Sequence, residues 1–130
     1  MRLAHNALLL SVLLSACVQS TIPEFSTKIP DDHPLTVEQV HHAIEIGLVD
    51  EQWQAREISP GVLEATKTHL TQSASVYIAY GYEGFSIEYA DSQHMDYNAA
   101  ADTIDASYKK WVYALYSSIQ YQLNQQVSTA

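Results

Sequence analysis

Apolar residues recur every three or four positions in two stretches of the chain, which predicts two amphipathic helices. The apolar positions of the first stretch are Val37, Val40, Ile44 and Leu48. We expect this helix from Val37 to about Leu48, with Thr36 and Gln39 in a capping box. The second stretch carries the larger stripe, formed by Ile104, Tyr108, Trp111, Val112, Leu115, Ile119 and Leu123. This C-terminal helix is therefore expected to supply most of the core.

Between the two helical stretches, short β-rich runs alternate with turn residues, which predicts strands. A Pro60-Gly61 corner separates residues 53–58 from residues 62–69, and we expect a first hairpin there. Residues 75–80 and 85–89 form the second expected hairpin. The order helix, four strands, helix predicts an α+β fold in which both helices cover one face of a four-stranded antiparallel meander, as a two-layer sandwich.

The N-terminal segment has the pattern of a secretory signal. Arg2 precedes an apolar run over residues 7–14, which is shorter than the roughly 20 residues that cross a bilayer. The run ends in Leu14-Ser15-Ala16-Cys17, which resembles the lipobox of bacterial lipoproteins. The resemblance implies that residues 1–16 are a signal peptide and that Cys17 is lipidated. The alternative is an ordinary signal peptide that is cleaved after Ala16.

The segment after the cysteine is polar or interrupted by proline, at positions Pro23, Pro30 and Pro34. We expect residues 17–34 to form the acylated cysteine and a tether, and residues 35–130 to form a single α+β domain. In Gram-negative lipoproteins, an aspartate after the lipidated cysteine favours retention in the inner membrane, whereas this chain has Val18. The resemblance therefore implies the periplasmic face of the outer membrane.

Charge restricts the possible partners. The chain has 6 Lys and Arg against 15 Asp and Glu, a net charge of −9, and loss of Arg2 with the signal would make it more acidic. This balance argues against nucleic acid and against anionic lipid, so we expect the domain to stand off the membrane. The chain has one cysteine, and its lipidation would leave none for a disulfide.

The histidines give little support for a metal site. His41 and His42 are adjacent, and adjacent helical residues point about 100° apart. Glu38 and His42 lie one helical turn apart and could chelate an ion together. The third ligand would have to come from another segment, at His33, His69 or His94. Solvated histidines are the simpler interpretation, and we expect neither a metal nor another cofactor.

Catalytic motifs are equally weak. Asp91-Ser92-Gln93-His94 holds the residue types of a hydrolytic triad, but neighbours on one loop cannot supply a separated nucleophile, base and orienting group. Gly81 and Gly84 precede a strand rather than a helix, which argues against a phosphate-binding loop. We therefore expect a protein that is not an enzyme.

The chain has nine tyrosines, which is its most unusual compositional feature. Tyr77, Tyr113 and Tyr121 fall outside the predicted core faces, where an amphipathic ring suits a protein partner, although partly exposed tyrosine is also common without one. We interpret the chain as a non-enzymatic protein-binding or assembly module. The alternative is a module for a small envelope ligand, a peptidoglycan fragment or a lipid, held beside Tyr80, Tyr108 and Trp111.

Most of the region from Trp53 to Leu123 resembles a family of small, uncharacterised proteobacterial lipoproteins, whose domain begins at a tryptophan strand and closes with a Tyr-x-x-Trp-Val helix. The resemblance is carried by Trp53, Arg56, Pro60-Gly61, Ala65-Thr66, residues 74–80, Phe85-Ser86-Ile87, Tyr89, Ser92, Tyr97, Ile104, Tyr108, Trp111-Val112, Leu115 and Ile119. Asp105 and Lys109 depart from the histidine and asparagine of that family. The resemblance implies a fold and an envelope location, and no reaction.

Overall fold

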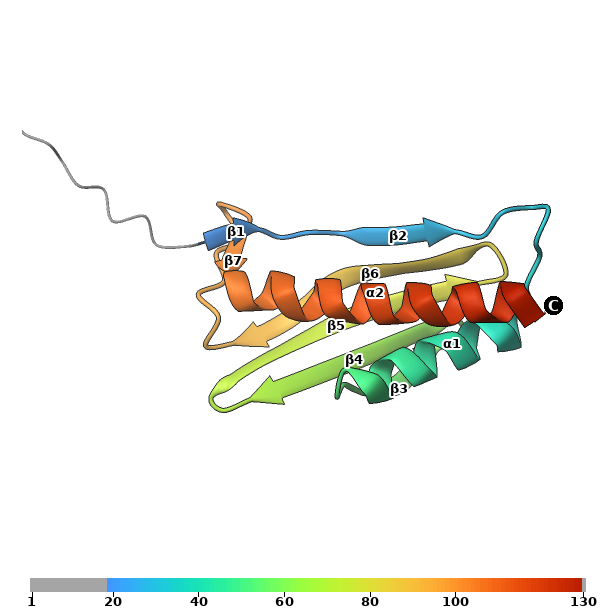
Figure 1. The fold of residues 1–130 in the computed structure, drawn as a ribbon. Helices are drawn as coiled ribbons and strands as arrows, with labels where there is room; N and C mark the ends of the chain where they lie inside the picture. Colours follow the sequence, from blue (N-terminus) through green and yellow to red (C-terminus); the bar gives the residue numbers. More distant parts are fainter. Residues whose placement is uncertain (1–18, 130) are drawn as a thin grey trace, which may run out of the picture.

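The computed structural model describes residues 19–129 of the chain, so the predictions for the signal peptide and for Cys17 lie outside the described residues (Figure 1). Its elements are β1 (Gln19–Thr21), β2 (Phe25–Lys28), α1 (Val37–Asp50), β3 (Gln54–Ser59), β4 (Val62–His69), β5 (Gln72–Gly81), β6 (Gly84–Gln93), β7 (Thr103–Asp105) and α2 (Ala106–Thr129).

An antiparallel sheet of five strands, in the order β2-β6-β5-β4-β3, forms one layer of the fold. The two helices lie together on one face of this sheet (Figure 1). Both predicted hairpins are present, as β3–β4 and β5–β6. The α+β class is therefore confirmed, whereas the four-stranded meander is wrong because β2 adds a fifth strand beside β6.

The segment predicted to be a tether contains two strands, so that prediction is wrong for residues 19–28. β1 pairs with β7 and β2 pairs with β6. The ring of Phe25 stacks on Tyr116 of α2 with centroids 5.0 Å apart, and Thr27 Oγ1 lies 2.8 Å from Tyr116 OH. Ile29 is buried at the end of β2. Phe25 and Ile29 therefore belong to the core. Their partners come from β6 and α2, which lie far away in the sequence.

Helix α1 begins as its sequence predicts. Thr36 Oγ1 accepts a hydrogen bond from Gln39 N at 3.1 Å, and Gln39 Oε1 accepts one from Thr36 N at 2.8 Å. Val37 was expected in the buried stripe but is 40% exposed, because it occupies the first turn. Gly47 lies within the helix, against Ile119 of α2.

Helix α2 begins later than its apolar stripe suggests, because Ile104 lies in β7, although it is buried. Asp105 caps the helix, and its Oδ1 accepts a hydrogen bond from Ser107 N at 2.8 Å. That hydrogen bond lowers the pKa of the Asp105 carboxyl.

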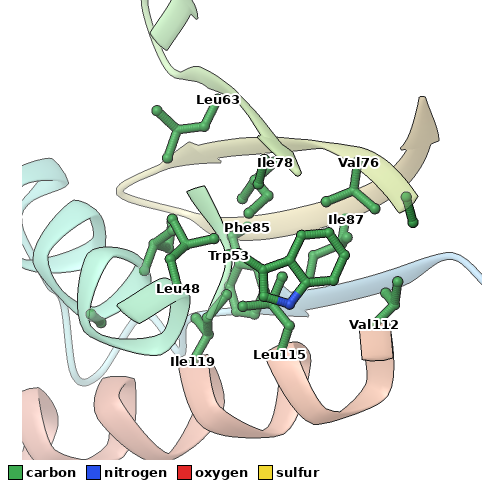
Figure 2. Packing of buried hydrophobic residues seen from close by; sticks show 14 of the residues in the cluster. Leu48, Trp53, Leu63, Val76, Ile78, Phe85, Ile87, Val112, Leu115 and Ile119 are labelled. Atoms are coloured by element: carbon green, nitrogen blue, oxygen red, sulfur yellow. The ribbon is translucent and has the colours of Figure 1, made fainter. Parts of the chain in front are cut away.

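The core lies between the two layers. Figure 2 shows the Trp53 indole among side chains from the strands and from α2. The sheet contributes alternate residues of its central strands: Leu63, Ala65, Ala74, Val76, Ile78, Phe85 and Ile87. Burying one large apolar side chain contributes about 1.5–3 kcal/mol, so this face positions the helices firmly. The opposite sheet face is left without a covering layer within the described part of the chain.

Candidate functional site

The three tyrosines predicted to bind a partner are exposed, but they do not form one surface. Tyr77, Tyr113 and Tyr121 are 38%, 58% and 60% exposed. Val76 and its alternate neighbours point toward the helices, so Tyr77 lies on the open face of the sheet. Tyr113 and Tyr121 belong to α2, on the other side of the molecule. The centroids of the Tyr113 and Phe25 rings lie 6.1 Å apart.

The rings of the alternative pocket are also separated. Tyr80 stacks on His41 of α1, with centroids 5.1 Å apart and an interplanar angle of 9°. Tyr108 is fully buried and meets Tyr89 edge-on at 5.6 Å. Trp111 lies beneath Lys67 Nζ, 5.7 Å from the ring centroid. The three rings thus pack against three different neighbours instead of surrounding one cavity.

The weaker motifs of the sequence are held in local interactions. Ser92 Oγ lies 2.9 Å from Tyr89 OH, and Ser92 N donates to Asp91 Oδ1 at 2.8 Å. Within residues 19–129, no group of three or more His, Cys, Asp or Glu side chains could hold a metal ion. None of the helices in this part of the chain is long and apolar enough to cross a membrane.

A groove between α1 and β3 combines apolar and charged groups. Its volume is ≈ 480 Å³ and its lining residues are His41, Glu45, Leu48, Val49, Ala55, Glu57 and Leu63. We call it the α1–β3 groove. β3 forms the edge of the five-stranded sheet, with no further strand on its outer side among the residues described. All six of its residues are exposed, so α1 leaves this edge of the sheet open.

The polar side chains of the α1–β3 groove lie close enough to interact electrostatically with one another and with Tyr80. His41 Nε2 lies 3.5 Å from Glu45 Oε1, and the His41 ring is held flat against Tyr80. Burial raises the pKa of the Tyr80 phenol, and the negative charges of Glu57 and then Glu45 raise it further. Both carboxylates therefore lie near the same ring, one on the helix and one on the edge strand.

This arrangement suits the binding of an extended chain. An edge strand presents unpaired backbone N–H and C=O groups, to which another strand can add. Alternate side chains of that strand would enter the groove, above the apolar side chains of Leu48 and Leu63 and beside the carboxylates of Glu45 and Glu57. The groove therefore offers backbone, apolar and cation-binding contacts in one place.

A larger hollow of ≈ 610 Å³ lies where β2 meets the β5–β6 turn. On the open sheet face its wall consists of the small side chains of Ser26, Ala79 and Ser86. Tyr82 also lines the hollow, and its hydroxyl donates a hydrogen bond to the neighbouring Glu83 at 3.3 Å. These groups give a shallow surface with few contacts for a ligand. The smaller α1–β3 groove is therefore the better candidate.

Sequence reasoning missed the α1–β3 groove, because His41 was weighed only as a metal ligand beside His42. Glu45 is exposed at the rim of the groove. A signal was present, since His41 and Glu45 lie one helical turn apart and Leu48, three residues after Glu45, belongs to the buried stripe of α1. No family model, curated protein or solved structure matches this chain, so the groove stands on its own geometry.

Proposed function

We propose that this chain is a lipid-anchored protein of the bacterial envelope whose domain binds a partner polypeptide in the α1–β3 groove and catalyses no reaction. The observation that carries the proposal is the exposed edge strand β3 beside an apolar floor and two carboxylates. It keeps the protein-binding function expected from the sequence and moves the binding surface from the tyrosines to this groove.

Binding adds the partner to the sheet as a sixth strand. Its backbone pairs with β3, and its inward side chains pack on Leu48, Val49 and Leu63. A lysine or arginine of the partner meets Glu45 and Glu57, where the acidic net charge of −9 also favours a basic segment. Ion pairs with exposed carboxylates contribute about 0–1 kcal/mol each, so the cation contributes to the choice of partner and the backbone and apolar contacts supply most of the affinity.

The anchor is proposed from the lipobox that ends in Cys17, and the periplasmic face of the outer membrane from Val18 beside it. Stable anchoring takes about two acyl chains or signals, which a diacylated cysteine supplies. Cys17→Ser tests this part of the proposal by fractionation of bacterial cells. The variant should leave the membrane fraction, and continued membrane association would refute the anchor.

The binding surface is tested by photo-crosslinking in cells that make the full chain. A photoreactive phenylalanine analogue replaces Val49, which is 74% exposed and lines the groove, or Tyr113, which is 58% exposed on α2. We expect a discrete cross-linked product from position 49 and none from position 113. Mass spectrometry of that product should map the cross-link to an extended segment with a lysine or arginine.

A charge reversal supplies the matched control. Glu57→Lys in the groove should abolish the cross-link from position 49, because it would repel the partner's cation. Glu88→Lys makes the same change on an exposed residue of β6, paired with Tyr77 on the open sheet face, and should leave the cross-link intact. Equal yields from the two variants would refute the groove as the binding surface.

A further inference from the structure

The first strand lies very close to the proposed lipid anchor. One residue, Val18, separates Cys17 from Gln19, where β1 begins. An extended chain advances at most about 3.6 Å per residue, so the two Cα atoms lie within about 7 Å of each other. β1 pairs with β7 through Gln19↔Asp105 and Thr21↔Thr103. The anchor is therefore attached directly to the fold, without the long tether expected from the sequence.

Several exposed parts of the molecule share the end at which β1 lies. Figure 1 shows β1, β7, the β4–β5 turn and the start of α2 at this end. The turn is joined to the loop after β6, because Gln72 Nε2 donates to the carbonyl oxygen of His94 at 3.2 Å. We call the β4–β5 turn (residues 70–71) and the loop 94–102 the anchor end.

Leu70 at the tip of the β4–β5 turn is 86% exposed. Its φ is 56°, a left-handed conformation that disfavours residues with a Cβ and favours glycine or asparagine. Leucine at this position helps neither the turn nor the core. An apolar surface outside the protein would explain its presence.

The loop of the anchor end presents a second amphipathic side chain on a rigid support. Tyr97 is 45% exposed and stacks on Tyr89 with centroids 4.5 Å apart. The loop is held by the buried Met95, whose carbonyl oxygen accepts a hydrogen bond from Asp105 N at 2.8 Å. Tyrosine is enriched at membrane interfaces, where its ring meets the lipid and its hydroxyl meets water.

The charge at this end selects the kind of lipid. The exposed lysines at the start of α2 are Lys109 and Lys110, whereas four carboxylates surround the loop, those of Asp91, Asp96, Asp102 and Asp105. Excess negative charge disfavours an anionic surface. A zwitterionic headgroup layer does not repel it.

We infer that the anchor end docks on the zwitterionic lipid surface that holds the acyl chains, with Leu70 and Tyr97 in the headgroup layer. The strands then run away from the bilayer, and the β5–β6 turn lies at the far end (Figure 1). This inference rests on the acylation of Cys17 in the proposed function. It replaces the expectation that the domain stands off the membrane.

The test places a fluorescent label at either end of the acylated protein. Because acylation consumes the only native thiol, Leu70→Cys provides a single site for an environment-sensitive dye. Tyr82→Cys, at a 66% exposed position in the β5–β6 turn, is the matched control. On vesicles of phosphatidylcholine, we expect a blue-shifted and brighter emission from position 70, quenched by spin-labelled lipid, and an unchanged emission from position 82.

Flotation of the vesicles separates this inference from the anchor on which it rests. If both labelled proteins float and their emission is the same, docking of the anchor end is refuted while the anchor stands. If neither protein floats, the anchor fails and docking fails with it. Replacing part of the lipid by phosphatidylglycerol should weaken the blue shift at position 70, and a stronger shift would contradict docking on a zwitterionic surface.

Discussion

Gly47→Ala is a sharp test of how α1 packs on α2. An added Cβ at this position would lie 2.7 Å from Ile119 Cγ1, 3.2 Å from Ile119 N and 3.4 Å from Ile119 Cα. The first of these distances is a clash, and the backbone atoms behind it cannot move away by a change of rotamer. The methyl group must therefore push the two helices apart.

Two effects of opposite sign determine the size of the change. Alanine within a helix is favoured over glycine by about 1 kcal/mol, whereas overpacking a core costs about 1–3 kcal/mol. Taking about 2 kcal/mol for the clash, Gly47→Ala should lower the free energy of unfolding by about 1 kcal/mol. In an Ile119→Ala background the clashing Cγ1 is absent, but the backbone N of residue 119 still lies 3.2 Å from the added Cβ and offsets the helix preference, so the same substitution should be close to neutral.

The assay is urea unfolding followed by circular dichroism on the four proteins of this double-mutant cycle. The cycle should give a coupling energy of about 1 kcal/mol between the two positions. If Gly47→Ala instead stabilises the native protein by its full helix preference, the close approach of the two helices at Gly47 is refuted.

Three further substitutions test the ends and the edge of the fold. Tyr108→Phe removes a buried hydroxyl without a hydrogen-bond partner among the described residues, so urea unfolding should show a stability that is unchanged or higher by about 1 kcal/mol. Burial raises the pKa of the Tyr108 phenol above 10.0, so this group ionises at a lower pH in the unfolded chain than in the folded protein. The free energy of unfolding therefore falls as the pH rises past 10.0, and Tyr108→Phe should lose less stability over this range than the native protein. Asp105→Ala should lower the free energy of unfolding by about 1 kcal/mol, because the hydrogen bond from Ser107 is lost. The stabilities of the native protein and of this variant should converge as the pH falls below 3.8, because the protonated Asp105 carboxyl no longer favours the fold. Gly84→Ala would place a methyl group against the Thr27 carbonyl at a φ of +143°, so amide exchange in β2 should accelerate, and unchanged exchange would contradict the pairing of β2 with β6.

The parts of the fold that depend on local signals could be predicted from the sequence. The hydrogen bonds between Thr36 and Gln39 set the start of α1, and the capping box that they form spans only four residues. The Pro60-Gly61 corner fixed the first hairpin, because Gly61 has a φ of 77° that the turn requires. The β-rich runs over residues 75–80 and 85–89 likewise predicted the second hairpin, which is β5–β6.

The edges of the sheet could not be predicted in the same way. Phe25 pairs with Ile87, and no local pattern shows that two such distant residues are neighbours. Pro23 and Pro30 flank this segment, so its few apolar residues were interpreted as part of a tether. The α1–β3 groove was missed for a related reason, since it exists only because β3 lies at an edge of the sheet, and strand order is a property of the whole fold.

The most direct test of strand addition at β3 is amide hydrogen exchange on the complex captured by the cross-link from position 49. In the free protein, the outward-pointing amides of β3 face solvent at the sheet edge. Pairing with a partner strand predicts slower exchange across residues 54–59 in the complex and unchanged exchange in β2, at the opposite edge of the sheet. Exchange in β3 that is as fast in the complex as in the free protein would contradict the proposed binding mode.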